Sequence, residues 1–326
     1  MLLVSVHSPA LLKVRQAVRS WLADLPINST VLVGVSGGAD SMALAVALFL
    51  ESYPNQNRVI PVVVDHGLQS NSAEICASVI VKLKKLGFED VFTSRAHVTM
   101  QDGIEASARR ARYKIFQQAL DTYSASVFFL GHTLDDQAET VLLGLARGSG
   151  TKSLSGMPEV IGPFIRPLLN IESATTDAAC SEYGIDVWND PHNFNEEFRR
   201  VRVRKNILPA LEKNLGPGIS QALARSARLL REDATALDEW AVRVYEDLDP
   251  KSLDVGVLAG LPKAIRSRVI RIAIYAAGAP AGSISADHIV PIEALVTNWR
   301  GQGSADLPGG VKVARISGRL SLSTPA

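Results

Sequence analysis

The 326-residue sequence is poor in cysteine, in long apolar runs and in net charge. Its two cysteines, Cys76 and Cys180, form neither a CxxC pair nor a zinc-type spacing, which argues against a disulfide framework and suits a reducing cytosol. The longest apolar stretch, residues 42–50, is too short to cross a bilayer. The first residues lack the basic start and cleavage site of a signal peptide. We therefore expect a cytoplasmic protein with no membrane partner.

The total charge gives no indication of a partner, but the distribution of charge does. Apolar residues make up 47% and charged residues 21%, which favours a packed core, and the net charge is only +1. Residues 199–231 nevertheless hold one acid, Glu212, and nine basic residues: Arg199, Arg200, Arg202, Arg204, Lys205, Lys213, Arg225, Arg228 and Arg231. This segment is either a solvated helix face or a surface for RNA phosphates. Because no acids interleave within it to form ion pairs, we favour RNA.

Apolar strand-like runs alternate with helical patterns along the first part of the chain. The expected strands lie at 30–36, 58–67, 89–96 and 125–133, and the expected helices at 39–52, 72–86, 104–122 and 135–147. This alternation predicts an α/β fold with a parallel sheet and helices on both faces. Ligands of such sheets bind at the carboxyl ends of the strands, which is where the unusual polar residues of this sequence fall.

The chain divides into four expected segments. We expect an N-terminal helix at 1–30, a catalytic domain at 31–215, a smaller mainly helical domain at 216–303 and a short β-rich tail at 304–326. Further helical patterns run over 219–247, 262–277 and 285–299. We find no internal repeat. Nothing in the sequence indicates the oligomeric state, and a homodimer stays open.

A buried strand passes into a helix through SGGADS at residues 36–41. Gly37 and Gly38 let the backbone turn sharply and leave its amides uncovered, and the helix dipole favours an anion at the same place. The turn is either such an anion site or an ordinary tight turn. Asp40 is either a helix cap or the ligand of a Mg²⁺ ion that bridges it to phosphate oxygens. No lysine precedes Ser41, so the turn is not a Walker loop.

SGGADS resembles the SGGxDS loop of the ATP-pyrophosphatase (PP-loop) enzymes, which split ATP into AMP and pyrophosphate and use the adenylate to activate a carbonyl. Four further stretches are similar to tRNA(Ile)-lysidine synthetases. They are VDHGLQ at 64–69, EASARRARY at 105–113, GHTLDDQAETVLLGLARGSG at 131–150 and DPHNFNEEFRRVRVRKNILP at 190–209. Gln69, Thr133 and Val201 depart from the commoner Arg, His and Asn of that family. The ordered set resembles a short form of this family.

The resemblance implies an activity and a set of residues. Family members ligate L-lysine to the wobble cytidine of the isoleucine tRNA with a CAU anticodon, through a cytidine adenylated by ATP, with Mg²⁺. The catalytic residues would be Asp40, Asp135 and Asp136. The ATP site would comprise Ser36, Gly37, Gly38, Ala39, Asp40, Ser41, Asp65, His66, Arg109 and Arg112, with Asp40 on the metal. The residues for tRNA and substrate would be His132, Glu139, Arg147, Arg200 and Arg204.

These residues also have physical readings of their own. Asp135, Asp136 and Glu139 crowd one helix start, where they either stabilise the helix dipole or bind a cation or an ammonium group. Asp135 or Asp136 is a candidate base for the attacking amine. Arg109 forms either a surface pair or an ATP contact. Three other functions compete with this one. The unpaired cysteines argue against a tRNA thiolase, and the lack of a glutaminase segment argues against a glutamine-dependent amidotransferase. The intact SGGADS argues against a non-catalytic RNA-binding protein.

Overall fold

The computed structural model describes residues 8–65, 67, 72–96, 104–148, 150–188 and 195–324. The chain packs as two units, Met1–Arg228 and Leu229–Ala326, and the division falls inside the helix α10 (Ile219–Glu246). Each unit has a hydrophobic core of its own. Within the described ranges, no helix combines the length and the hydropathy that a bilayer crossing demands.

The first unit is built on a six-stranded sheet with the order β3-β2-β1-β4-β6-β5. Its strands are β1 (Thr30–Gly34), β2 (Arg58–Asp65), β3 (Phe92–Arg95), β4 (Val127–Phe129), β5 (Val160–Ile161) and β6 (Phe164–Ile165). Neighbouring strands are parallel except β5 and β6. Val31 lies opposite both Val59 and Val127, so β1 is central. The carboxyl ends of β2, β1 and β4 therefore meet at one edge.

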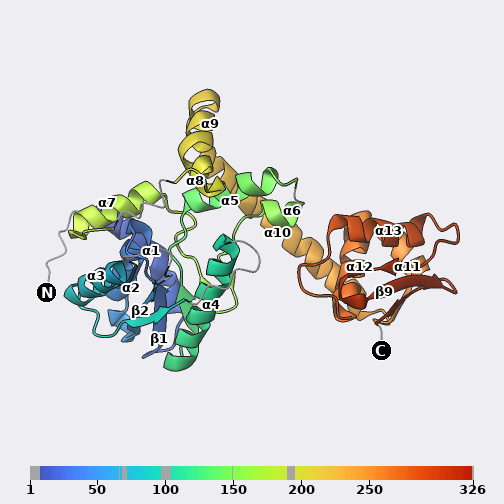
Figure 1. Ribbon diagram of the computed structural model, residues 1–326, viewed down its shortest axis with the longest axis horizontal. Helices are drawn as coiled ribbons and strands as arrows, with labels where there is room; N and C mark the ends of the chain where they lie inside the picture. The colour runs from blue at the N-terminus through green and yellow to red at the C-terminus, as the bar shows by residue number, and fades with distance from the viewer. Residues whose placement is uncertain are drawn as a thin grey trace. The chain divides into compact units, whose positions relative to one another are not determined.

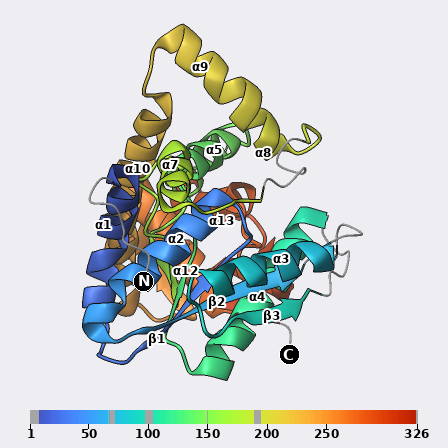
Figure 2. The same cartoon turned by 90° about the vertical axis from the view of Figure 1, so that its left-hand side faces the viewer.

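Helices cover both faces of this sheet, as the sequence predicted (Figures 1 and 2). One face carries α1 (Pro9–Ala23), α2 (Ala39–Glu51), α3 (Ser72–Lys85) and α7 (Ser173–Tyr183). The other face carries α4 (Ile104–Tyr123), whose Phe116 lies 4.3 Å from Phe128 of β4, measured between ring centroids. Helix α2 is buried from Met42 to Leu48, because it lies beneath both α1 and α7. Its unbroken apolar run is therefore the mark of a central helix.

A second group of helices lies after β4 in the chain, with α5 and α6 before β5 and β6 and the others after α7. It comprises α5 (Leu134–Leu145), α6 (Thr151–Leu154), α8 (Arg199–Arg202), a π-helix (Val203–Ile207) and α9 (Leu208–Leu215). Ala138 of α5 packs with Val203 and Leu208 in a small apolar cluster. This cluster fixes the basic segment that begins at Arg199 against α5.

The second unit packs helices against an antiparallel sheet. Its elements after α10 are β7 (Ser252–Asp254), α11 (Val255–Gly260), α12 (Lys263–Ala276), α13 (Ala286–Thr297), β8 (Ala305–Asp306), β9 (Lys312–Ile316) and β10 (Arg319–Ser323). The sheet order is β7-β10-β9-β8. The sequence suggested a separate tail at 304–326, but Val313 and Leu320 are buried in the same core as Val269 and Ile292. The strands of the tail therefore pack as part of this unit.

Candidate active site

The SGGADS turn joins β1 to α2 at the carboxyl edge of the first sheet. Gly37 has φ = +90°, and a Cβ there would lie 2.6 Å from the side chain of Val79, so only glycine fits. The two serine hydroxyls, Ser36 Oγ and Ser41 Oγ, lie 3.2 Å apart, and the backbone N–H of Ser36 donates to Ser41 Oγ at 3.1 Å. The turn is thus held by its own serines beneath the N-terminus of a 13-residue helix. This arrangement suits an anion such as pyrophosphate.

Gly131 brings the end of β4 onto the same turn. A Cβ at Gly131 would lie 3.1 Å from the backbone carbonyl of Asp40 and 3.2 Å from Ser41 Cα. The glycine therefore permits a close backbone approach. As a result, the residues that follow β4 lie beside the SGGADS turn.

Asp40 points from the first turn of α2 toward other carboxylates. It accepts a hydrogen bond from the hydroxyl of Thr176 on α7. Burial raises the pKa of Asp40 to about 7, reinforced by the negative charges of Asp136 and Asp177 and opposed by the Thr176 bond. A cation beside Asp40 would offset this repulsion, so the carboxylate fits a Mg²⁺ ion shared with phosphate oxygens. In the described ranges, no cluster of three or more His, Cys, Asp or Glu side chains could hold a metal ion by itself.

A narrow cavity of about 260 Å³ opens beside the turn. Its walls include the carboxyl half of β2 together with Val79 and Phe116, which are apolar, and Asp65, which ends β2. The Asp65 carboxylate accepts a hydrogen bond from the N–H of Gly67 at 2.9 Å. An apolar slot with one carboxylate at the strand end has the character of a nucleoside site. The predicted residue His66 lies outside the described residues.

A larger cavity of about 1000 Å³ adjoins the other side of the turn. Carboxylates from α2, α5, α9 and from α7 with its N-cap line it, namely Asp40, Asp135, Asp136, Glu172, Asp177 and Glu212. Arg112 and Arg204 also line it. The two cavities share five lining residues, which are Ser36, Ser41, Arg112, Gly131 and Trp188.

The two neighbouring aspartates at the start of α5 have different surroundings. One oxygen of Asp135 accepts the backbone N–H of Ser173 at 2.8 Å. Asp136 accepts the N–H of Thr133 at 3.0 Å and the guanidinium of Arg200 at 2.7 Å. Burial of Asp136 favours its neutral form, but the charge of Arg200 and its other partners lower the pKa of Asp136 below the ordinary value. Asp136 is therefore held as an ion by two arginines and a backbone N–H, whereas Asp135 accepts the single backbone hydrogen bond from Ser173.

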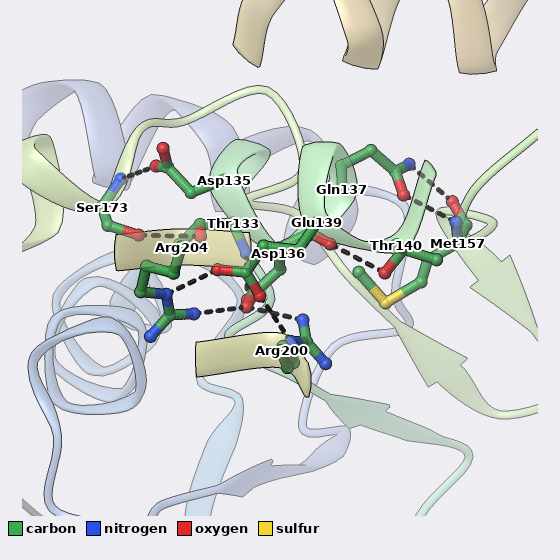
Figure 3. A network of polar contacts seen from close by, with 10 residues as sticks. All are labelled: Thr133, Asp135, Asp136, Gln137, Glu139, Thr140, Met157, Ser173, Arg200 and Arg204. Carbon is green, nitrogen blue, oxygen red and sulfur yellow. Dashed lines mark hydrogen bonds and ion pairs between the residues drawn. The ribbon is translucent and has the colours of Figure 1, made fainter. Parts of the chain in front are cut away.

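Arg200 and Arg204 face α5 and make ion pairs there (Figure 3). The Nε atoms of both arginines donate to the two oxygens of Glu139, each at 2.5 Å, and Glu139 is fully buried. Both arginines also contact Asp136. The sequence interpretation left them without acidic partners, and that interpretation is wrong. Their acids come from another helix, 61 to 68 positions earlier in the chain.

The remaining predicted residues divide between the cavities and the surface. His132 lines the narrow cavity, and its Nδ1 has no hydrogen-bond partner among the described residues. Burial lowers the pKa of His132 to about 4, although the Asp136 charge opposes it. Arg109 instead lies over the ring of Tyr113, 5.0 Å from its centroid, and Arg147 is exposed at the end of α5. Neither Arg109 nor Arg147 lines a described cavity.

Sequence interpretation missed several residues that the structure brings to these cavities or to the side chains that line them. Thr176 and Asp177 come from α7, and Trp188 follows that helix. Gln137 was given no more than a hydrogen-bonding capacity, and its amide pairs with both backbone groups of Met157 at 2.6 and 2.8 Å (Figure 3). The strands at 160–165 were also missed, because they have only two residues each. No motif spacing marks Thr176, Asp177, Trp188 or the two short strands.

The fold and the turn define the class of the chain. The family model of a PP-loop domain matches residues 11–211. Among solved structures, the U34-tRNA thiolase NcsA from Methanococcus maripaludis superposes with a TM-score of 0.57 at 22% identity, over 68% of this chain and 79% of that one. This likeness shows the fold alone. The chain is thus a PP-loop protein, and this domain supports the predicted use of ATP.

Closer relatives give the family. The chain is 47% identical to the tRNA(Ile)-lysidine synthase of Thermobifida fusca over 97% of this chain and 98% of that protein. It is 44% identical to the tRNA(Ile)-lysidine synthase of Salinispora arenicola over 98% of both. A model described as the TilS substrate binding domain matches residues 253–321. The chain belongs to the tRNA(Ile)-lysidine synthase family of ATP-dependent ligases, so the resemblance found in the sequence is confirmed.

The cysteines do not fit sulfur transfer, the competing chemistry of the same fold. Burial, with the charges of Asp177 and Asp40, raises the pKa of Cys180 to about 12. Burial also raises the pKa of Cys76. Because the thiolate is the reactive form of cysteine, neither thiol is prepared to act as a nucleophile.

Proposed function

We propose that this cytoplasmic chain ligates L-lysine to the wobble cytidine of the isoleucine tRNA with a CAU anticodon. ATP adenylates the carbonyl oxygen of the cytosine ring, pyrophosphate leaves, and the side-chain amine of lysine then displaces AMP. The observation that carries this proposal is that a nucleoside-sized cavity and a large acidic cavity meet at the SGGADS turn. Activation and attack can therefore occur in adjoining spaces.

The SGGADS turn would hold the pyrophosphate half of ATP. The backbone amides of the turn, and the hydroxyls of Ser36 and Ser41, would be donors for phosphate oxygens, and the N–H of Gly38 would exchange its long 3.4 Å bond to Ser36 Oγ for one of them. Arg112 lines both cavities and supplies positive charge near the phosphates. Asp40 would hold Mg²⁺, which when bound neutralises charge on the leaving pyrophosphate.

The acidic cavity would hold lysine, with Asp135 as the group that orients and deprotonates its amine. The ammonium of lysine has an ordinary pKa of about 10.4, so a base must take its proton before attack. Asp136 is a poor base, because Arg200 and Arg204 hold it as an ion with a lowered pKa. Asp135 lines the same cavity and accepts one backbone hydrogen bond, from Ser173. This choice narrows the pair of candidates that the sequence left open.

The basic residues of 199–231 divide into two roles under this proposal. Arg200 and Arg204 stabilise the acidic edge of the cavity, as their ion pairs with α5 indicate. Lys213 and Arg225 are exposed and suit contact with tRNA phosphates. The proposal thus keeps tRNA binding on this segment but assigns it to other side chains.

A labelled-lysine assay tests the proposal. The chain is incubated with ATP, Mg²⁺, labelled lysine and either the isoleucine tRNA with CAU or the methionine tRNA with the same anticodon. Label should appear on the isoleucine tRNA alone. Label on neither tRNA, with ATP hydrolysed to AMP, would contradict the proposal.

Two substitutions then separate the half-reactions. Asp40→Asn should stall before adenylation, because it removes charge at the leaving group. Asp135→Asn should accumulate AMP-linked tRNA and transfer lysine poorly. The readout is the amount of AMP-linked tRNA with and without lysine. If neither variant forms the AMP-linked species, Asp135 serves ATP rather than lysine.

A further inference from the structure

Five residues line both cavities, and one of them is aromatic. Ser36, Ser41, Gly131 and Arg112 belong to the turn and its surroundings, and the fifth residue is Trp188. Among the described residues that line the larger cavity, Trp188 is also the sole aromatic side chain. The junction of the two cavities therefore has a single flat apolar wall within the part of the chain that the structure describes.

Trp188 is tied to the SGGADS turn through its backbone. Its N–H donates to the carbonyl oxygen of Gly37 at 2.9 Å. A Cβ built on Gly37 would lie 3.6 Å from Cβ of Trp188. The indole is half-buried. Because the tether is a backbone bond, the side chain can be changed without removing the bond that positions it.

The proposed reaction requires the target nucleobase, cytosine, at the junction of the two cavities. This inference rests on the proposed function. Adenosine in the narrow cavity and pyrophosphate on the turn would place the α-phosphorus between them, at the residues that the two cavities share. The target cytosine must then come from the larger cavity. Its carbonyl oxygen forms a bond to the α-phosphorus, while the bond from that phosphorus to the bridging oxygen breaks and pyrophosphate leaves with the electron pair.

We propose that Trp188 is the wall against which the unstacked wobble cytosine lies while its oxygen attacks ATP. A base taken out of an anticodon loop loses its neighbours, and an aromatic side chain replaces that stacking. Phe116 does not offer this surface, because it lines the narrow cavity only and packs on Phe128. Trp188 is thus a base-positioning residue, and the competing occupant of its surface is the adenine of ATP.

The test uses Trp188→Ala, Trp188→Leu and Trp188→Phe in the full chain, with Trp21→Phe as the control. Trp21 lines a separate cavity beside α1. Two quantities are measured: the Kd for ATP without tRNA, and kcat/KM for adenylation of the tRNA. Trp188→Ala and Trp188→Leu should lower kcat/KM by about 10- to 100-fold, the range of base–aromatic stacking. Trp188→Phe should stay within about 5-fold of wild type because it keeps a ring, and the Kd for ATP should not move.

Three results would overturn the assignment. The first is a weaker ATP Kd in Trp188→Ala without tRNA, by the same factor as the loss of adenylation, which would place adenine on the ring. The second is an unchanged kcat/KM for adenylation in Trp188→Ala or in Trp188→Leu. The third is an equal loss of kcat/KM in Trp188→Leu and Trp188→Phe. Both variants retain an apolar side chain, but only Trp188→Phe retains an aromatic ring. If the wild-type chain adenylates no tRNA, the proposed function and this inference fall together, whereas an active wild type with an equally active Trp188→Ala removes this inference alone.

Discussion

Glu139→Gln isolates the buried ion pairs at the start of α5. Glu139 is fully buried and accepts one guanidinium from each of Arg200 and Arg204, whose side chains remain 33% and 45% exposed. Removing one partner of a fully buried pair costs about 3–5 kcal/mol, because a charge is left without compensation. Water reaches part of both arginines, so we expect the free energy of unfolding to fall by the lesser amount of about 2–3 kcal/mol.

Thermal unfolding measures this loss. For a unit of this size, each kcal/mol corresponds to about 2–4 °C, so Tm should fall by roughly 5–10 °C. The matched control is Asp90→Asn, which removes the ion pair between Arg58 and Asp90, two side chains that are 56% and 45% exposed. An exposed pair contributes less than about 1 kcal/mol. The control should therefore shift Tm by less than about 4 °C.

A double-mutant cycle identifies the partner. Glu139→Gln with Arg204→Gln should lose less stability than the sum of the single changes, by about 1–2 kcal/mol, because the two groups share a network. Equal Tm values for Glu139→Gln and Asp90→Asn would refute the structural role. Glu139 would then be open to substrate, as the sequence first indicated.

Three further predictions follow from other parts of the first unit. Burial holds the pKa of Asp40 at about 7 against an ordinary 3.8. The folded chain therefore keeps a proton that the unfolded chain releases, and this group's contribution to stability declines as pH rises from about 4 to about 7. Asp40→Asn should be more stable than wild type at pH 8, by up to about 4 kcal/mol, and equal to it near pH 4, in denaturant titrations; a pH-independent difference would contradict this. Gly156→Ala should destabilise by about 1–3 kcal/mol, since φ is +62° and the new Cβ would lie 2.4 Å from Gln137 Oε1; unchanged unfolding would show that the loop can shift. Lys213→Ala with Arg225→Ala should reduce the salt dependence of tRNA binding by roughly one unit of slope per lost phosphate contact, while ATP binding stays the same; an unchanged slope would place the RNA elsewhere.

The fold could be predicted because its signals are local. Strands that are buried on both faces are continuous apolar runs, and the helices between them follow a regular period. The strand predicted at 58–67 begins at the same residue as β2 (58–65). The strand predicted at 125–133 contains the whole of β4 (127–129). The sharp SGGADS turn could be predicted equally well, because a Gly-Gly pair between a strand and a helix is typical of such a turn. Gly37 does adopt a positive φ.

The arrangement of charge could not be predicted from the same patterns. The basic segment holds one acid, and no rule of spacing indicates that Arg200 and Arg204 reach Asp136 and Glu139 on α5. Trp188 was missed for a related reason. It belongs to no motif of the sequence, and only the folded chain shows that it lines two cavities. Tertiary packing determines both the ion pairs of the two arginines and the position of Trp188, so neither can be predicted from local sequence patterns.

The distance along the chain between α5 and its arginines bears on how the enzyme is made. Asp136 and Glu139 precede Arg200 and Arg204 by 61 to 68 residues. At a synthesis rate of about 5–20 residues per second, the acids are translated roughly 3–14 s before the arginines that neutralise them. During that interval, burial of Glu139 would leave its charge without a counter-ion. We therefore expect the nascent chain to close the acidic edge of the larger cavity only after the basic segment has been synthesised.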